Sequence, residues 1–383
     1  MSSNTRHARM LCVITVLFWL SVYTYIPILT PYTSGLGMSY TMAGLVVSSY
    51  GFMQMVCRIP IAISSDLLGK RKLFLVAGIL SSLISCAGLW LFTQPVLVLI
   101  FRGMAGLAVS VWAIFVTLYT SFAKGQDHSK AMGIVNGMMC AGQLCGLVAG
   151  GFIAFALDYR STFAAGAVAA IIALVLSLSI PESVPEKSSG ITFRSLIALL
   201  GNRELLFFSS MAMILQLVIY SGAFGFLSTV LKEMGMGEIV LGMAPAFTSL
   251  PTVLSSFASG SYFKERWGMK RTLVVAFVTL AVTSYLAVSV RHLAAILLLQ
   301  LLVGFARGLI LPSCTALATR SVEPALRSSA TGFFQAVYGI GMTLGPLVIG
   351  IATDYFTMNA GFLLVSCIAL LGAVLVALRP IQD

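Results

Sequence analysis

Long apolar runs alternate with short polar segments along the whole chain. A helix needs about 20 mainly apolar residues to cross a bilayer, and twelve runs meet this length. They cover 11–34, 41–64, 73–93, 96–122, 131–157, 161–180, 205–231, 239–262, 272–290, 293–318, 328–353 and 357–378. The pattern predicts an all-α membrane protein with twelve transmembrane helices.

The composition agrees with a lipid environment. Of the 383 residues, 59% are hydrophobic and 9% are charged, and the mean hydropathy is +1.00. A soluble protein carries about 25% charged residues, so this chain cannot cover a surface that faces water. The net charge of +11 does not indicate nucleic-acid binding, because no basic run is long or interleaved with aromatic residues. The seven cysteines lie in apolar runs without a CxxC pair, which predicts core residues and no disulfide or metal site.

A short charged segment occurs twice, and the two copies are 199 positions apart. Asp66, Gly69 and a basic cluster return as Glu265, Gly268 and a second basic cluster. Four glycines repeat at the same offset, namely Gly133, Gly142, Gly146 and Gly151 as Gly332, Gly341, Gly345 and Gly350. The repeat predicts two copies of one unit. We expect an N-terminal six-helix bundle over 1–180, a polar linker over 181–204 and a C-terminal six-helix bundle over 205–383.

The distribution of basic residues predicts the orientation. With the N-terminus placed in the cytoplasm, 17 of the 23 Lys and Arg residues fall in cytoplasmic segments. Three, Arg160, Lys232 and Arg291, fall in external loops, and the other three fall inside predicted spans. Cytoplasmic loops of membrane proteins are rich in Lys and Arg, so we expect both termini to lie on the cytoplasmic side of a cell membrane.

The span count, the repeat and three motifs resemble the major facilitator superfamily over essentially the whole chain. The segment after span two fits the signature Gly-x-x-x-Asp-x-x-Gly-x-Arg-Lys, except that Ala62 replaces the first glycine. Span four fits Arg-x-x-x-Gly at Arg102 and Gly106. Span five resembles an antiporter signature, with Leu147 in place of the characteristic proline, which the second copy carries as Pro346. The resemblance implies two pseudo-symmetric bundles that rock about a substrate near the bilayer midplane.

The resemblance also implies roles for the repeated segments. The charged segment would latch the two bundles on the cytoplasmic side, although a positive loop that only sets topology is an alternative. The expected gating residues are Asp66, Gly69, Arg71 and Lys72 in the first copy and Glu265, Gly268, Lys270 and Arg271 in the second. Small residues let helices pack closely. The expected helix-packing residues are Gly142, Gly146, Gly150, Gly151, Gly341, Gly345 and Pro346, with antiport as an added inference.

Three arginines lie inside predicted spans, where a charge costs about 2.5–3.5 kcal/mol or more and marks a functional candidate. Arg58 lies in an Arg-Ile-Pro motif similar to one in nitrate and nitrite carriers, but other nitrate signatures are absent. Its alternative role is a structural contact near the cytoplasmic side. For Arg102 we weigh a part in proton or substrate transfer against an internal anchor. Arg307, near the middle of span ten, is the main substrate candidate against a structural role.

Aromatic and polar residues complete the predicted site. The expected substrate-binding residues are Arg307, Arg58, Arg102, Tyr23, Tyr50, Gln54, Gln216 and Tyr220. No acid lies in the middle of a span. An arginine in a cavity attracts anions, and its fork geometry suits a carboxylate or a phosphate.

The sequence therefore predicts a secondary active transporter of a small solute, an organic anion or an acidic amphipathic compound. A multidrug efflux antiporter and a non-transporting sensor with a carrier fold are the alternatives. No catalytic, metal-binding or ATP-binding motif is present, so we expect no enzyme activity, cofactor or metal. The expected partners are lipid, the solute, and H⁺ or Na⁺ as a coupling ion, with a monomer sufficient.

Overall fold

A computed structural model describes residues 3–123, 128–182, 199–259, 263–323 and 326–381. Within these residues, twelve helical segments are long and apolar enough to cross a membrane. Spans one, four and seven each consist of more than one helix, and the other nine spans are single helices. The elements are α1 (Ser3–Tyr23), η1 (Ile26–Ile28), α2 (Leu29–Gly35), α3 (Tyr40–Leu68), α4 (Arg71–Leu91), α5 (Pro95–Ser110), α6 (Trp112–Phe122), α7 (His128–Ala156), α8 (Tyr159–Leu178), α10 (Arg203–Ser221), η2 (Gly222–Phe226), α11 (Leu227–Glu233), α12 (Glu238–Ala258), α13 (Lys264–Ser289), α14 (Leu293–Arg320), α15 (Arg327–Tyr355) and α16 (Met358–Leu378). The predicted twelve-span, all-α architecture is confirmed.

The helices begin and end where local chemistry satisfies their backbone groups. The side chains of Ser39, Asp158 and Thr357 accept backbone N–H bonds at the starts of α3, α8 and α16. Gly69 ends α3 with a φ of 62°, a left-handed conformation that glycine adopts without a Cβ clash. The chain can therefore reverse at once into α4.

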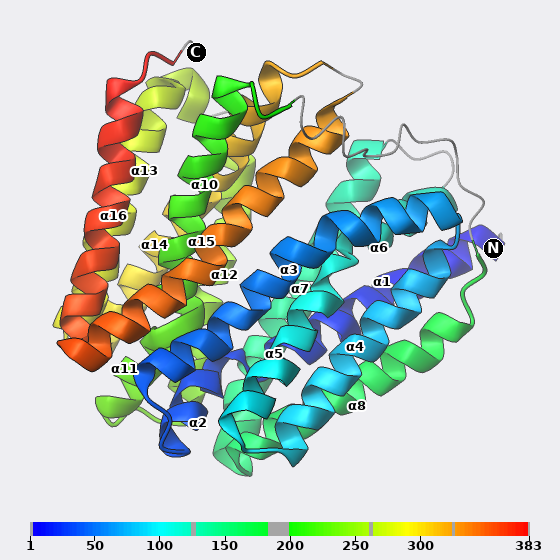
Figure 1. Cartoon of the computed structure of the whole chain (residues 1–383), viewed down its shortest axis with the longest axis horizontal. Coiled ribbons are helices and arrows are strands. Elements are labelled where there is room, and N and C mark those ends of the chain that lie inside the picture. Colours follow the sequence, from blue (N-terminus) through cyan, green and yellow to red (C-terminus); the bar gives the residue numbers. More distant parts are fainter. Residues whose placement is uncertain (1–2, 124–127, 183–198, 260–262, 324–325, 382–383) are drawn as a thin grey trace.

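The helices form two bundles with the same internal pairing. In the first bundle α1 packs on α7, α3 on α5 and α4 on α8. In the second bundle α10 packs on α15, α12 on α14 and α13 on α16. Figure 1 shows the two bundles side by side, with α3 and α15 running along the boundary. Residues 183–198 of the predicted linker lie outside the described residues, so the linker and its bounds stay a prediction.

Glycines set the close approach of helices within each bundle. A Cβ on Gly142 or Gly146 would meet the backbone of α1, and one on Gly341 or Gly345 would meet the backbone of α10. These four glycines are two repeat-related pairs, so the same contact is made in both bundles. Large apolar side chains on the outer faces of the bundles are exposed, as Leu371, Val374 and Leu378 of α16 show. Lipid is the solvent that suits such a surface.

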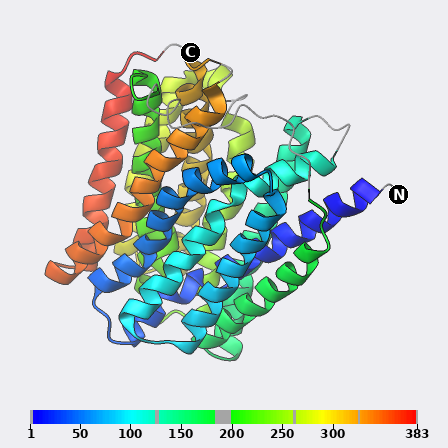
Figure 2. The same cartoon turned by 45° about the vertical axis from the view of Figure 1, so that its right-hand side comes forward.

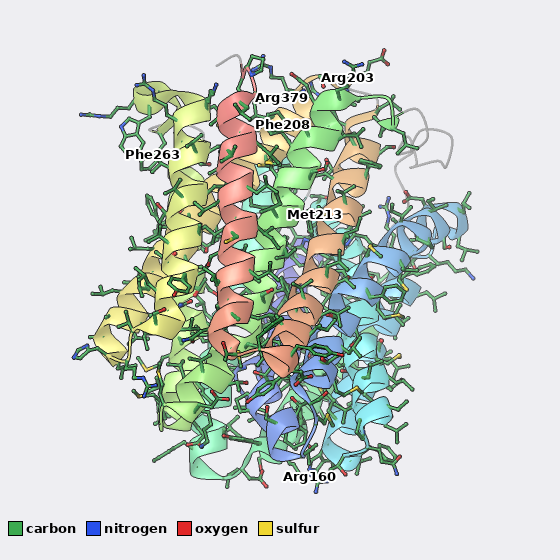
Figure 3. All side chains as sticks on the ribbon, turned by 60° about the vertical axis from the view of Figure 1, so that its left-hand side comes forward. Arg160, Arg203, Phe208, Met213, Phe263 and Arg379 are labelled. Atoms are coloured by element: carbon green, nitrogen blue, oxygen red, sulfur yellow. The ribbon has the colours of Figure 1, made fainter. Side chains whose placement is uncertain are left out.

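The two bundles contact each other through α3 with α15 and through α7 with α12. Figure 2 shows α3, in blue, beside α15, in orange, in a second view. We call the side that carries Gly69 and Pro380 the termini side. We call the side that carries the turns at 36–39, 157–158, 234–237 and 356–357 the far side. Arg203 and Arg379 lie on the termini side and Arg160 lies on the far side (Figure 3). On the far side, a Cβ on Gly151 would lie 2.9 Å from the Glu238 carbonyl oxygen. The bundles are therefore packed against each other there.

Candidate substrate site between the two bundles

Spans one and seven are broken at matching positions near their middles. Span one is interrupted after Tyr23, where α1 gives way to η1 and α2. Span seven is interrupted at η2, where Gly225 has non-helical dihedral angles of −122° and −107°. The breaks start at Thr24 and Gly222, which are 198 positions apart. Broken helices near the midplane form the binding sites of many secondary transporters.

The two breaks are joined to each other. The Thr30 hydroxyl of α2 donates a hydrogen bond of 2.8 Å to the Gly225 carbonyl oxygen of η2. The bond ties the residue at the break in span seven to α2 of the first bundle. The rings of Tyr23 and Phe224 meet edge to face with centroids 6.0 Å apart. A polar and an aromatic contact therefore connect the bundles at the breaks.

A cluster of aromatic side chains surrounds the breaks. Tyr50 of α3 stacks on Tyr220 of α10, with centroids 6.0 Å apart and ring planes 18° apart. Phe224 lies 5.6 Å from Tyr220, centroid to centroid. Tyr23, Tyr50 and Tyr220 are at most 5% exposed. The structure thus brings together three tyrosines that the sequence analysis named, and it adds Phe224 to them.

Two glutamines flank the stacked tyrosines on the termini side. Gln54 and Gln216 each lie four residues from a tyrosine of the stack, one helical turn nearer to the termini side. Both side chains are buried, and their Oε1 atoms have no hydrogen-bond partner within the described residues. Buried polar atoms in proteins are normally paired. These two acceptors are therefore available to a ligand or to water.

Arg307 lies at the edge of the aromatic cluster. Its guanidinium carbon is 5.3 Å from the centroid of the Phe224 ring, a cation–π distance. The side chain is half-buried, and among the described residues it makes no hydrogen bond or ion pair. Arg307 has no charged counterpart in the first bundle, because Val109 occupies the position 198 residues earlier. Within the described part of the chain, this guanidinium lies against the Phe224 ring and has no anionic partner.

Arg102, in contrast, is held inside the first bundle. It is 2% exposed, and its Nη1 donates to the Tyr25 hydroxyl at 3.0 Å. Its guanidinium carbon lies 4.5 Å from the centroid of the Tyr50 ring. The second bundle carries Gln300 at the matching position, bonded at 2.9 Å to Thr248, which matches Tyr50. At the position of Arg102, the second bundle thus has a neutral residue, which also makes a hydrogen bond inside its own bundle.

Arg58 bridges the two bundles nearer to the termini side. Its Nη1 donates to the Gln335 Oε1 at 2.6 Å and to the Tyr338 hydroxyl at 3.3 Å, both on α15. Its partners are side chains of the opposite bundle, so Arg58 makes a structural contact between the bundles. Of the three intramembrane arginines, Arg58 and Arg102 have hydrogen bonds to described residues and Arg307 has none.

The charged repeat segments lie on the termini side, each against its own bundle. Asp66 faces Arg71 of the same hairpin at 3.9 Å. The Lys72 Nζ donates to the Leu178 carbonyl oxygen at 2.7 Å. In the second copy, Gly268 has a φ of 74° and breaks α13, and Glu265 and Arg271 are exposed. The latch between bundles stays a prediction.

The far side carries contacts that the sequence analysis missed. Asp354 of α15 accepts backbone N–H bonds from Tyr40 and Thr41 of α3. The Tyr40 hydroxyl donates to Glu233 at 2.8 Å, and the Tyr159 hydroxyl donates to Glu238 at 3.3 Å. The sequence shows these acids at the ends of apolar runs, which was the available signal of a contact. It could not show their partners, because these are distant in the sequence.

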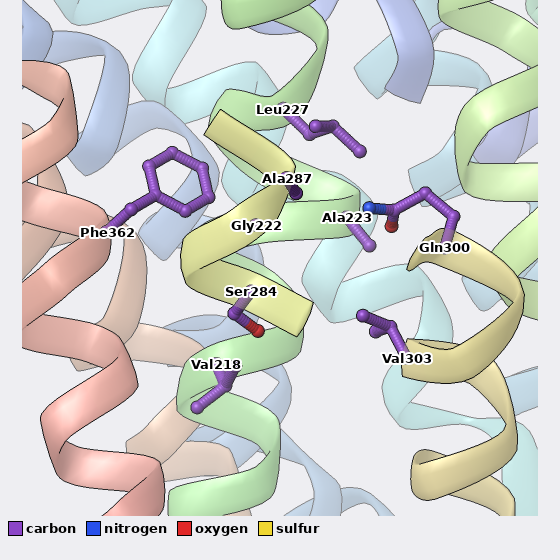
Figure 4. A pocket seen from close by; sticks show the side chains of 9 residues that line it. All are labelled: Val218, Gly222, Ala223, Leu227, Ser284, Ala287, Gln300, Val303 and Phe362. Carbon is purple, nitrogen blue, oxygen red and sulfur yellow. The ribbon is translucent and has the colours of Figure 1, made fainter. Parts of the chain in front are cut away.

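A small cavity lies inside the second bundle beside the break in span seven. Its volume is about 10 Å³, which is enough for one water molecule. The side chains around it are Val218, Gly222, Ala223, Leu227, Ser284, Ala287, Gln300, Val303 and Phe362 (Figure 4). This cavity is too small for a solute, and it contains none of the three arginines.

Two matching six-helix bundles with a polar and aromatic site between them define a polytopic membrane carrier. The sequence profile of the Major Facilitator Superfamily matches residues 11–283 and 219–382. The chain therefore belongs to the Major Facilitator Superfamily of transporters. Membership in this family also makes it a transporter rather than an enzyme.

Relatives and solved structures agree with this assignment. An MFS-type transporter of Methanocaldococcus jannaschii is 22% identical over 358 residues, which are 88% of this chain and 90% of that protein. An MFS-type transporter of Bacillus subtilis (strain 168) is 25% identical over 144 residues, 37% of this chain and 32% of that protein.

The solved structures resemble the whole chain. The nucleoside transporter NupG has a TM-score of 0.82 at 16% identity, covering 97% of this chain and 98% of that one. A bacterial homologue of the human lysosomal transporter Spinster, in an inward-facing and unoccupied conformation, has a TM-score of 0.82 at 15% identity, covering 99% and 97%. The human organic anion transporter MFSD10 has a TM-score of 0.66 at 17% identity, covering 98% and 100%. These likenesses show the fold.

Proposed function

We propose that this protein is a secondary active transporter that carries a small organic anion by alternating access. The solute binds between the broken spans one and seven, with its acidic group at Arg307 and its apolar part against Phe224 and the tyrosines. A fork of N–H donors matches a carboxylate or phosphate group. The two unpaired glutamine oxygens accept hydrogen bonds from donor groups of the solute.

The observation that carries this proposal is the unpaired Arg307. A cation within a membrane is costly unless it meets a counter-charge, and no described acid lies against this one. Arg58 and Arg102 already have protein partners. We assign Arg102 to anchoring the first bundle and Arg58 to joining the bundles. An anionic solute supplies the partner that Arg307 lacks.

The conformation supports a site that is reached from the termini side. The polar bridges between bundles described above extend from the far side to Arg58. Beyond Arg58, Ser65 is the one buried residue among 59–68 of α3. The bias of basic residues places the termini side in the cytoplasm. We therefore take this conformation to be inward-facing, as is the Spinster homologue by its description.

The gating residues fit the same scheme. While the termini side is open, Asp66 faces Arg71 in its own hairpin. When the bundles close on that side, the hairpin meets the opposite bundle and Asp66 exchanges partners. The far-side contacts of Asp354 and Glu238 separate at the same time. A latch on one side thus forms as the contacts on the other side break.

The named neighbours do not select the solute. They include a nucleoside transporter and an organic anion transporter. At such low sequence identity, the substrate of a neighbour does not indicate the substrate of this chain. The aromatic cluster favours a second candidate, a lipophilic compound held by ring stacking, which would make the protein a multidrug exporter. A lipophilic cation would be repelled by Arg307, so the two candidates differ in the charge of the solute.

Flux into proteoliposomes tests the proposal. A panel of radiolabelled aromatic carboxylates is offered under imposed pH and Na⁺ gradients, beside tetraphenylphosphonium as a lipophilic cation. Arg307→Ala should lower anion flux by at least about tenfold, since a hydrogen bond to a charged group contributes about 1.5–3 kcal/mol. Arg307→Lys should restore part of it. Arg291→Ala, an exposed far-side change, is the control.

Three results decide between the candidates. Cation flux that survives Arg307→Ala, with no anion flux in the unchanged protein, supports the exporter of lipophilic compounds. Anion flux that is unaffected by Arg307→Ala contradicts the proposed site. Ligand binding without flux under any gradient would indicate a sensor with a carrier fold.

A further inference from the structure

A groove lies on the outside of the second bundle at its termini side. Its volume is about 500 Å³, and its walls are Trp267, Lys270, Arg271, Val274, Val275 and Ala377. These residues belong to the start of α13 and the end of α16, two helices packed against each other. Figure 3 labels Phe263 and Arg379, just beyond the groove residues of each helix, at the same end of the molecule. The groove combines an apolar wall with two cations.

The groove opens onto the surface that faces lipid. On α13 the exposed residues Val275, Val278 and Val282 form a stripe at helical spacing that starts in the groove. On α16 Val374 and Leu378 are exposed beside it. Trp267 is 44% exposed at the helix start, where tryptophan commonly marks the membrane interface. A molecule in the groove would therefore have its polar end at the cations and an apolar chain along the stripe.

Among the described residues, the two cations have no acid partner. Within the described residues, neither Lys270 nor Arg271 makes a hydrogen bond or an ion pair. Because Gly268 breaks α13, the membrane-spanning part of this helix starts beside the two cations. The first turn of a helix carries free N–H groups and partial positive charge. The groove is thus positive, and no described residue supplies a counter-charge.

The first bundle shows what fills the matching place. There Lys72 donates to Leu178, and the Glu182 carboxylate accepts the backbone N–H of Lys72 at 3.0 Å. The positions 199 residues later are Arg271, Ala377 and Ile381. The helix caps Asp158 and Thr357 keep the same offset. The second copy therefore has an isoleucine where the first copy has the capping acid, while both copies have a basic residue at the helix start.

We propose that the groove between α13 and α16 binds one anionic phospholipid, with its headgroup phosphate at Lys270 and Arg271 and an acyl chain along Val275, Val278 and Val282. The phosphate takes the place that Glu182 holds in the first bundle. Basic pockets between transmembrane helices on the cytoplasmic side suit such headgroups. The site is separate from the substrate site and does not depend on the proposed function.

Native mass spectrometry of the purified chain tests the site, with dioleoylphosphatidylglycerol and dioleoylphosphatidylcholine as probes. We expect one tightly held phosphatidylglycerol and weaker phosphatidylcholine. Lys270→Gln and Arg271→Gln should each weaken phosphatidylglycerol about fivefold, and the double variant more. Arg291→Gln, on the far side, is the charge-matched control. Equal retention of both lipids, or unchanged affinity in the double variant, would overturn the proposal.

Two further variants separate the lipid from a free anion. Val275→Trp fills the groove and keeps both cations, so it should exclude the lipid. Ile381→Glu supplies the acid of the first bundle and should displace it, whereas Ile381→Gln should not. If glycerol phosphate without acyl chains competed as well as the lipid, the groove would be an anion site only. Lipid retention in Val275→Trp would contradict the predicted position of the chain.

Discussion

Asp354 caps the N-terminus of a helix that belongs to the other bundle, beginning at Tyr40. Its Oδ1 accepts the Tyr40 N–H at 3.0 Å, and its Oδ2 accepts the Thr41 N–H at 2.8 Å. The carboxylate also faces the positive end of the α3 dipole. Because α3 and α15 are in different bundles, this cap exists only while the far side is closed. Asp354 thus joins the two bundles on the far side, and its hydrogen bonds must break when the bundles separate there.

Asp354→Asn should shift the protein towards the far-side-open conformation. The change keeps the shape of the side chain and removes its charge, which contributes about 0.3–1 kcal/mol at a helix N-terminus. Spin labels at Leu157 and Phe356, exposed far-side positions in the two bundles, would report a larger population of long distances. The labels require a background without the native cysteines.

Asp158→Asn is the control for this change. Asp158 is a far-side acid, but it caps α8 within its own bundle. Its loss should leave the label distances unchanged. An equal shift in both variants would assign the effect to far-side charge in general and contradict the role of Asp354.

The span pattern was readable from the sequence because lipid imposes it, and the repeat was readable because matching residues recur at one offset. Backbone groups that face lipid must be paired within a helix, and the side chains around them must be apolar, so each span appears as a long apolar run. The offset of 199 survives in the helix caps Asp158 and Thr357 and in the packing glycines. The number of spans and the two-fold repeat of the chain follow from these two signals, whereas the pairing of helices within each bundle comes from the structure.

The candidate site was only partly predictable, because its contacts join distant segments. The tyrosines and Arg307 could be named as buried polar groups in apolar runs. Their partners could not be predicted, because the bond from Arg102 to Tyr25 joins residues that are distant in the sequence. Phe224 was missed because an aromatic residue in a span is ordinary. The paired glycines around it, Gly222 and Gly225, were the available signal of a break.

Substitution of Arg102 should lower the stability of the protein, whereas substitution of Arg307 should lower transport without lowering stability. Arg102→Ala removes a buried charged donor and leaves a cavity, so the melting temperature in detergent should fall, by an equivalent of about 2 kcal/mol or more. Arg307→Ala removes a half-buried cation without protein hydrogen bonds, and it should leave the melting temperature unchanged or raise it. A lower melting temperature for Arg307→Ala than for Arg102→Ala would contradict the anchoring role of Arg102 and the substrate-binding role of Arg307.

Asp158 should give a pH-dependent contribution to stability. Hydrogen bonds from Ser161 lower the pKa of the Asp158 carboxyl. A lowered pKa in the folded state means that the contribution is present above the unfolded value, about 4, and is lost as the pH falls through the folded value. Asp158→Ala should therefore cost about 0.5–2 kcal/mol at pH 7, and less at pH 3. Thr357→Ala, the matching cap of α16, should cost the same at both pH values, as thermal unfolding would show.

Gly151 and Gly350 should control how closely the bundles approach, whereas the other signature glycines control packing within a bundle. A Cβ on Gly151 would strike α12 and one on Gly350 would strike α3, each across the boundary. Alanine at either position should therefore open the far side, with a cost to the closed state of about 1–3 kcal/mol. The opening would be seen as longer distances between the labels at Leu157 and Phe356.

Gly146→Ala should instead lower the melting temperature, because a Cβ there meets α1 of its own bundle at 3.0 Å. A Cβ on Gly137 of the same helix would meet nothing within 4 Å. Gly137→Ala should therefore neither lengthen the label distances nor lower the melting temperature. Unchanged distances in both Gly151→Ala and Gly350→Ala would mean that the far-side boundary has room for a methyl group and is not set by these glycines.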